Sequence, residues 1–295
     1  MNLRQARTRE AVLGWLLVLP AVALLATFTH WPAVLTVWAA LHTKPVPGRP
    51  SRFDPWDNFD SMLDDPVFHQ ALGNNLFYGA VLIPVTMVLA LTMALAVNGR
   101  MPGRSFLRLA YFTPTVLPMI AVANIWLFFF TPGYGLFARV LSPFGLGSFN
   151  WLGNPDTALP AITMIAVWKE AGFYMIFYLA ALQAIPVDLT EAAALEGASR
   201  VYYFRRVLWP LLMPTTLFVF VNATIDAFRL VDQVIVLTRG GPDNTTLLLL
   251  YYVYQVGFQY FDANYASALT VVIVAVLGLL AILQFGVIGR RVHYR

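Results

Sequence analysis

The stretch EAAALEGASRVYYFRRVLWPLLMP, residues 191–214, lies between two long apolar runs and is itself charged and amphipathic. Residues 192–195 are strong helix formers, and Asp188 is placed to cap the helix that contains them. Gly197 is suited to end that helix in a sharp turn, and Ser199 is suited to cap a second helix. The stretch therefore predicts two short helices that meet at an angle outside the apolar runs.

The composition indicates that most of the chain is not in contact with water. Of its 295 residues, 59% are hydrophobic and 12% are charged, whereas soluble domains carry about 25% charged residues. The basic residues fall at the ends of apolar runs and do not gather on one polar domain, so nucleic acid is not an expected partner. The absence of cysteine excludes thiolate metal sites, and the four histidines have no ligand spacing. A membrane protein without a metal site is the expected class.

Six runs are apolar and long enough to cross a bilayer, which takes about 20 residues in a helix. We expect these spans over residues 11–40, 72–97, 106–130, 158–184, 211–237 and 267–289. The first run is too long for the core of a signal peptide, so it is expected to remain as a span. The predicted architecture is an all-α membrane protein with six transmembrane helices in one domain, residues 1–295.

Lysine and arginine predict which ends of the spans face the cytoplasm, because these residues accumulate in cytoplasmic loops. The larger set comprises Arg4, Arg7, Arg9, Arg100, Arg104, Arg108, Arg200, Arg205, Arg206, Arg290, Arg291 and Arg295. The connections on the other side hold Lys44, Arg49, Arg52, Arg139 and Arg239. Both termini and the loops near residues 98–108 and 185–210 are therefore expected on the cytoplasmic side.

The 191–214 stretch permits two interpretations. On physical grounds alone it fits an amphipathic helix lying on lipid headgroups. Its pattern, E-A-A followed by Gly197 and an L-x-x-P ending at Pro214, resembles the cytoplasmic "EAA" loop by which permease subunits of bacterial ABC importers dock onto their ATPases. That family often has aspartate before the glycine, and Glu196 keeps the charge. The resemblance implies ATPase coupling through Glu191, Ala192, Ala193, Glu196, Gly197 and Ser199.

Other motifs extend the resemblance along nearly the whole chain. Residues 151–159 resemble the approach to the family's fourth span, and LAALQAIP, residues 179–186, resembles the lead into the loop. Residues 265–268 resemble the start of the last span. The outer-face element "LT-x-GGP" of carbohydrate-type importers is matched at Thr238, Gly240, Gly241 and Pro242. The chain thus resembles the permeases of maltose and sn-glycerol-3-phosphate importers, which implies a type I ABC importer permease fold.

Polar residues inside the spans mark a candidate transport path, since such groups are costly in a membrane and are usually functional or paired. The candidates are Asn124, Lys169, Glu170, Tyr174, Asn222, Asp226, Arg229 and Asp232. A simpler interpretation is that Asp226 and Arg229, three residues apart on one helix face, form an internal ion pair that orients the span. On the functional interpretation, the amides and the tyrosine suit a solute with hydroxyl groups, and Arg229 suits an anionic one.

The chain lacks the nucleotide-binding loop G-x-x-x-x-G-K-[ST], because neither of its lysines follows a glycine. The resemblance implies a non-catalytic permease subunit that binds no cofactor, while two partner ATPase subunits use ATP and Mg. The other implied partners are a second homologous permease subunit in a heterodimer, an extracytoplasmic solute-binding protein and membrane lipid. The implied location is the bacterial cytoplasmic (inner) membrane.

Two other functions stay open at this point. An ion-coupled secondary carrier would normally show two halves related as repeats, and none is visible. An intramembrane enzyme with a serine nucleophile would need G-x-S-x-G, and the nearest matches, at Ser105 and Ser199, lack the final glycine. The expected function is to pass a sugar or sugar-phosphate-like solute, a carbohydrate or sn-glycerol-3-phosphate, across the membrane by alternating access. The sequence does not identify the solute.

Overall fold

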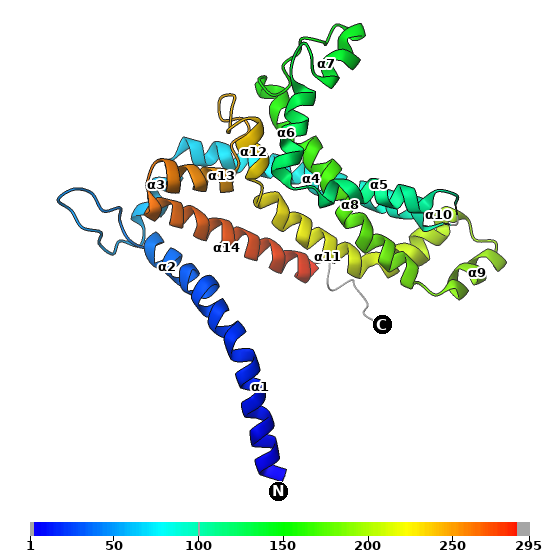
Figure 1. The fold of residues 1–295 in the computed structure, drawn as a ribbon, viewed down its shortest axis with the longest axis horizontal. Helices are drawn as coiled ribbons and strands as arrows, with labels where there is room; N and C mark the ends of the chain where they lie inside the picture. The colour runs from blue at the N-terminus through cyan, green and yellow to red at the C-terminus, as the bar shows by residue number, and fades with distance from the viewer. Residues whose placement is uncertain (1–2, 100, 288–295) are drawn as a thin grey trace. The chain divides into compact units, whose positions relative to one another are not determined.

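The chain is mainly α-helical in this computed structural model, which describes residues 3–99 and 101–287 (Figure 1). The predicted cytoplasmic arginines at positions 100, 290, 291 and 295 lie outside the described residues. The α-helices are α1 (Leu3–Leu25), α2 (Trp31–Ala40), α3 (Asp57–Leu63), α4 (Pro66–Asn98), α5 (Arg104–Val116), α6 (Met119–Phe130), α7 (Leu136–Leu141), α8 (Pro155–Ala184), α9 (Val187–Leu195), α10 (Arg200–Tyr203), α11 (Trp209–Phe228), α12 (Asp232–Leu237), α13 (Leu249–Tyr254) and α14 (Ala263–Val287). Short π-helical turns, at Ala26–His30, Phe204–Leu208 and Gln255–Gln259, continue α1, α10 and α13.

Five helical segments of the described chain are long and apolar enough to cross a membrane, and the bent pair α5 and α6 brings the number to six if it forms one span. The predicted run 106–130 is therefore not one straight helix. It bends by 100° between Val116 and Met119. Pro118 explains the break, because proline lacks an N–H and disfavours a helical conformation in the residue before it. Leu117 is accordingly extended, with φ −73° and ψ 135°.

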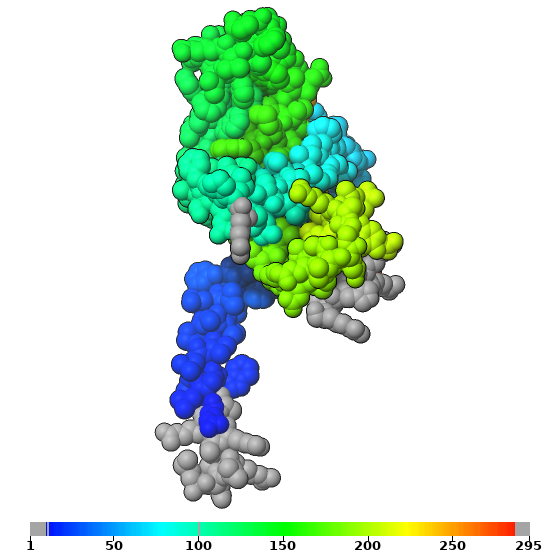
Figure 2. Space-filling model, turned by 90° about the vertical axis from the view of Figure 1, so that its right-hand side faces the viewer, coloured from blue at the N-terminus to red at the C-terminus, as the bar shows by residue number. Residues whose placement is uncertain are grey.

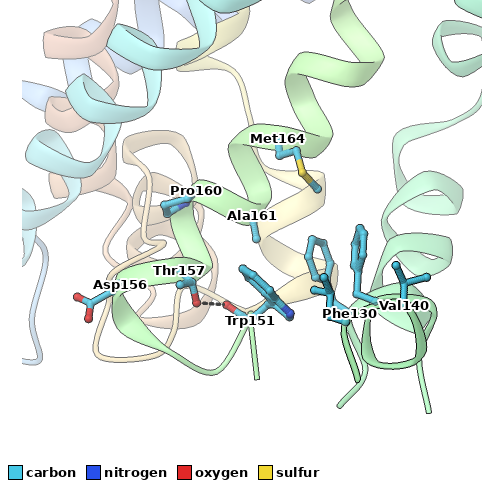
Figure 3. A pocket seen from close by; sticks show the side chains of 10 residues that line it. Phe130, Val140, Trp151, Asp156, Thr157, Pro160, Ala161 and Met164 are labelled. Atoms are coloured by element: carbon cyan, nitrogen blue, oxygen red, sulfur yellow. Dashed lines mark hydrogen bonds between the residues drawn. The ribbon is translucent and has the colours of Figure 1, made fainter. Parts of the chain in front are cut away.

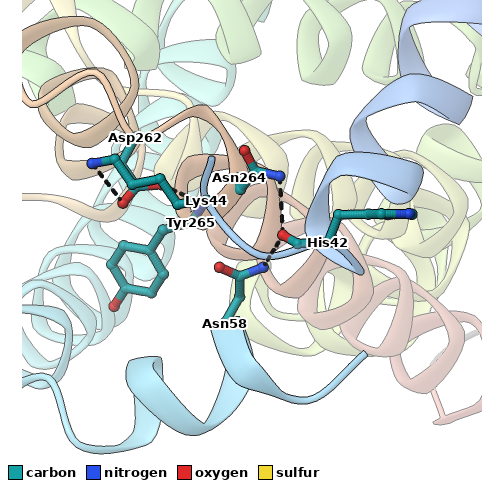
Figure 4. A network of polar contacts seen from close by, with 6 residues as sticks. All are labelled: His42, Lys44, Asn58, Asp262, Asn264 and Tyr265. Atoms are coloured by element: carbon teal, nitrogen blue, oxygen red, sulfur yellow. Dashed lines mark hydrogen bonds and ion pairs between the residues drawn. The ribbon is translucent and has the colours of Figure 1, made fainter. Parts of the chain in front are cut away.

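The described chain divides into two compact units: residues up to 64 together with 253–272, and residues 65–252 together with 273–287. The prediction of a single domain over residues 1–295 stays a prediction. In the first unit, the amides of Asn58 and Asn264 both donate to the carbonyl oxygen of His42, at 3.0 and 2.9 Å (Figure 4). Lys44 and Asp262 form an ion pair at 3.1 Å beside them. These contacts join the segment after α2 to α3 and to the first turn of α14.

The core of the second unit is formed where α4, α8 and α11 pack together. Alanines at positions 90, 94 and 223 are buried among Tyr174, Met175 and Tyr178 of α8. Gly172 lets α5 approach α8 closely, since a Cβ at this position would lie 2.0 Å from the carbonyl oxygen of Tyr111. Small residues at such crossings are how membrane helices gain van der Waals contact.

Two buried amides connect helices of the second unit through hydrogen bonds. Asn75 of α4 donates to the carbonyl of Ala227 at 3.2 Å and accepts from the backbone N–H of Leu249 at 3.3 Å, so it joins the end of α11 to the start of α13. Gln284, near the end of α14, donates to the hydroxyl of Thr224 at 2.7 Å. Both amides are buried, and these hydrogen bonds offset part of the cost of removing a polar group from water.

Candidate functional site

Two short helices form the segment between α8 and α11, as the sequence predicts. Gly197 separates α9 from α10 and has φ +69°, a left-handed conformation that glycine adopts without steric cost. Ser199 caps α10, as expected, because its hydroxyl accepts from the backbone N–H of Tyr202 at 3.2 Å. The cap predicted for the first helix is wrong: α9 begins at Val187, and Asp188 lies inside its first turn. Pro186 precedes that turn and suits an early helix start, because it needs no hydrogen-bond partner for a backbone N–H.

A side-chain hydrogen bond joins the two short helices across the turn. The hydroxyl oxygens of Thr190 in α9 and Tyr203 in α10 lie 2.7 Å apart. The backbone N–H of Ala198 also donates to the carbonyl of Ala193 at 3.0 Å, which closes the end of α9. The angle between the helices is thus set both by the backbone at Gly197 and by a contact between side chains.

The same segment exposes large apolar side chains. Leu195 is 90% exposed, and Val187, Val201 and Tyr202 are 67%, 63% and 58% exposed. In the space-filling view, residues near 190–210 form the yellow-green mass on the side of the second unit that faces the viewer (Figure 2). Exposed apolar groups next to charged ones, here Glu191 and Glu196, are typical of protein interaction surfaces. We call residues 187–208 the coupling segment, after the role that the family resemblance predicts for it.

The coupling segment lies at one end of the helix pair α8 and α11, because it connects the end of α8 to the start of α11 (Figure 1). With 30 residues in α8, the helix is roughly 45 Å long at about 1.5 Å per residue. Glu170 lies midway along it. A polar group at this position is therefore roughly 20 Å from the coupling segment.

A cavity of about 470 Å³ opens beside Glu170, where two interrupted helices meet. One interruption is the bend between α5 and α6, and the other is the non-helical stretch 229–231 between α11 and α12. The amide of Gln233 in α12 is fully buried and donates to the sulfur of Met119, the first residue of α6, at 2.9 Å. The cavity is lined by Thr115, Met119, Glu170, Phe173, Asn222, Asp226, Arg229, Leu230, Val231 and Asp232.

Three hydrogen bonds hold polar groups next to this cavity. The hydroxyl of Tyr174 donates to the carboxylate of Asp226 at 2.6 Å. The ammonium of Lys169 donates to the backbone carbonyl of Thr115 at 3.1 Å, and the hydroxyl of Thr115 donates to the carbonyl of Lys169 at 3.0 Å. The helical partner of the Thr115 carbonyl is lost at the bend, so Lys169 supplies a replacement.

Five of the eight predicted path residues line the cavity: Glu170, Asn222, Asp226, Arg229 and Asp232. Lys169 and Tyr174 lie directly behind its wall and bond to residues that line it. Asn124 does not reach the cavity, and its amide donates to the carbonyl of Ile120 in its own helix. The alternative of an Asp226–Arg229 ion pair is wrong, since no carboxylate in the described residues lies within ion-pair distance of Arg229.

The sequence interpretation missed Thr115, Met119 and Gln233. Only one signal pointed to them, the pair Leu117–Pro118 within an apolar run, which indicates a break in the helix. The neighbour that meets this break is more than 100 positions later in the chain. No local pattern shows such a contact.

The residues predicted to lie on the outer face form a tight turn after α12. Gly240 has φ +87°, and a Cβ there would lie 3.2 Å from the ring of Tyr251. The hydroxyl of Thr246 donates to the carbonyl of Gly241 at 2.8 Å and lies 2.7 Å from the hydroxyl of Thr238. The Gly241–Pro242 peptide bond is cis. The coupling segment precedes the first residue of α11, whereas this turn comes after the last residue of α11 and after α12.

A separate cavity of about 380 Å³ lies between α6, α7 and the first turns of α8. Figure 3 shows Phe130, Val140 and Trp151 gathered on one side, with Asp156 pointing away from them. Thr157 donates to the carbonyl of Trp151 at 2.7 Å. The lining is mostly apolar and offers few groups that could orient a polar solute, so the cavity beside Glu170 is the better candidate for a transport path.

The family described as "Binding-protein-dependent transport system inner membrane component" matches residues 84–294. The chain belongs to this family. It is therefore the inner-membrane component of a binding-protein-dependent importer, a permease that crosses the inner membrane several times. Relatives along the full length support this assignment.

The trehalose/maltose transport system permease protein MalF of Thermococcus litoralis is 36% identical over 271 residues, which are 90% of this chain and 91% of that protein. The sn-glycerol-3-phosphate transport system permease protein UgpA of Yersinia pestis is 31% identical over 287 residues, 96% of each chain. The fold of a bacterial ABC transporter involved in the import of the acidic polysaccharide alginate matches with a TM-score of 0.83, at 22% identity over 98% of each chain.

Proposed function

We propose that this permease imports a carbohydrate or sugar-phosphate-like solute by alternating access, driven by ATP hydrolysis in two partner ATPase subunits. The single observation that supports this most strongly is the coupling segment. It is a rigid pair of helices, fixed by Gly197 and the Thr190–Tyr203 bond, and it presents exposed apolar side chains. The ATPase-coupling residues proposed from the family's loop, Glu191, Ala192, Ala193, Glu196, Gly197 and Ser199, all lie in it.

The proposed direction of transport follows from the order of the elements along α8 and α11. The coupling segment, at the cytoplasmic end, receives the ATPase movement. The polar cavity lies along the chain between this segment and the Thr238–Pro242 turn, which is on the outer side in this proposal. Both termini are cytoplasmic in this proposal. Movement of α8 and α11 at one end changes the cavity through the two helix interruptions, since broken helices at membrane depth are where transporters place their solute sites.

Other chains complete the proposed importer. A solute-binding protein delivers the solute, which accords with the family's dependence on such proteins and with the structure of the alginate transporter in complex with its periplasmic protein. A second, homologous permease forms a heterodimer with this chain and closes the other half of the path. The subunit itself is non-catalytic and binds no cofactor, so ATP and Mg are used by the partners.

Cross-linking tests the proposed role of the coupling segment directly. The chain has no cysteine, so Leu195→Cys creates a single attachment point for a benzophenone label on the purified permease before the ATPase subunits are added. Val140→Cys, on exposed α7, is the matched control. We expect the label at position 195 to cross-link to the ATPase and the label at 140 not to do so. Equal cross-linking, or none at 195 in an assembled complex, would contradict the proposal.

A further inference from the structure

The groups that line the cavity beside Glu170 offer many hydrogen-bond acceptors without a partner among the described residues. Carboxylates accept hydrogen bonds only, and three of them, Glu170, Asp226 and Asp232, line the space. Neither Glu170 nor Asp232 has a hydrogen bond or an ion pair with any described residue. One oxygen of Asp226 accepts from Tyr174, which leaves its other oxygen for a ligand. The wall thus offers several unused acceptors.

Donors at the same wall are fewer than acceptors, and several already have a partner. The hydroxyl of Thr115 donates to the Lys169 carbonyl, and the amide of Asn222 donates to the carbonyl of Phe218 at 2.7 Å. Lys169 is 9% exposed, and its ammonium donates to a backbone carbonyl. Arg229 is the remaining charged donor that lines the cavity and is free of a described carboxylate.

The charges of the wall, like its hydrogen-bonding groups, disfavour an anionic solute. Three carboxyl groups line the cavity against one guanidinium, and the formal charge of the wall remains negative when the ammonium of Lys169 behind it is included. A phosphate or carboxylate solute is an acceptor and carries negative charge, so it would meet like charge and a wall richer in acceptors than in donors. Hydroxyl groups of a neutral sugar donate to carboxylates without this repulsion, and Arg229 can donate to a ring or glycosidic oxygen.

From these observations we infer that the solute of this permease is a neutral, polyhydroxylated sugar and not an anionic one. The inference rests on the proposed function, because it takes the cavity to be part of the transport path. It separates this chain's solute from the two acidic solutes in the names of its matches, sn-glycerol-3-phosphate and alginate. The cavity volume, about 470 Å³, lies within the roughly 300–1,000 Å³ of small-ligand pockets.

Uptake into proteoliposomes tests the inference with the whole importer: this chain, its neighbouring permease, the ATPases and the binding protein. Labelled trehalose and maltose are compared with glycerol-3-phosphate and an alginate pentasaccharide, with and without internal ATP. The inference predicts ATP-dependent uptake of a neutral sugar. ATP-dependent uptake of an anionic solute would overturn the inference and leave the proposed function intact. Uptake of any solute that needs no ATP would overturn the proposed function, and the inference with it.

A matched pair of ligands tests whether the named carboxylates cause the selectivity. Binding of trehalose and trehalose 6-phosphate to the purified complex is measured by equilibrium dialysis. We expect the wild type to favour trehalose at least tenfold, and Asp226→Asn combined with Asp232→Asn to reduce that ratio at least threefold. Asp57→Asn, at an exposed position in α3, is the charge-matched control and should leave the ratio unchanged. An unchanged ratio in the double variant, or a wild type that favours the phosphate, would overturn the inference.

Discussion

The hydroxyl oxygens of Thr190 and Tyr203 lie 2.7 Å apart and join the two helices of the coupling segment on either side of Gly197. A force applied by a partner to α9 can therefore reach α10, and through it the start of α11, without relying on one flexible turn. This contact and the left-handed glycine together give the segment a defined angle.

Removing either hydroxyl should weaken the coupling of ATP hydrolysis to transport. A hydrogen bond of this kind contributes about 0.5–1.5 kcal/mol, so Thr190→Val and Tyr203→Phe should each reduce solute transported per ATP hydrolysed by roughly twofold to tenfold. The double variant should lose no more than either single one, because both remove the same bond. Tyr202→Phe, whose hydroxyl has no partner among the described residues, is the control and should transport normally. Additive losses would contradict the role of the bond.

Gly172→Ala should destabilise the second unit. The new methyl group would lie 2.0 Å from the carbonyl oxygen of Tyr111, and overpacking of this kind costs about 1–3 kcal/mol. Gly73→Ala in α4 meets no atom within 4 Å and should be neutral or slightly stabilising, since alanine favours helix more than glycine. Thermal unfolding of the two variants in detergent measures the difference, and equal Tm values would show that α5 and α8 do not pack as described.

Lys169→Met should also lower the Tm, although it removes a charge from a membrane helix. The backbone carbonyl of Thr115 would lose its donor at the bend, and a buried unsatisfied group costs about 1–3 kcal/mol. Lys44→Met breaks an ion pair whose lysine is 43% exposed, and exposed pairs contribute about 0–1 kcal/mol. If Lys169→Met is as stable as Lys44→Met, the ammonium does not support the helix break.

Local properties of the sequence were enough to predict most elements. Length and hydropathy located the apolar spans, and Gly197 and Ser199 predicted the turn and the second cap because their effects act within a few residues. Asp188 was assigned the wrong position because the proline two residues earlier allows the helix to begin sooner. The alternation of basic residues predicted the orientation of the ends, which stays a prediction.

The cavity could be predicted only in part. Glu170, Asp226 and Asp232 were found because charge within an apolar run is unusual, and the same criterion placed Arg229 near them. Their arrangement depends on the meeting of the α5–α6 bend with the α11–α12 interruption, held by the Gln233–Met119 contact. That contact joins residues far apart in the sequence, so a search for local patterns could not find it. Asn124, polar within a span, is satisfied by its own helix instead.

Substitution of Gly197 tests the central claim, that the coupling segment transmits ATP hydrolysis to the transport path. Uptake by proteoliposomes containing the complete importer should be driven by ATP, nearly retained in Gly197→Asn, and lost in Gly197→Val. Asparagine tolerates the observed φ of +69°, whereas a β-branched residue does not. Both variants should still assemble with the ATPases, as measured by co-purification. Full ATP-driven uptake by an assembled Gly197→Val complex, or wild-type uptake that needs no ATP, would contradict the account.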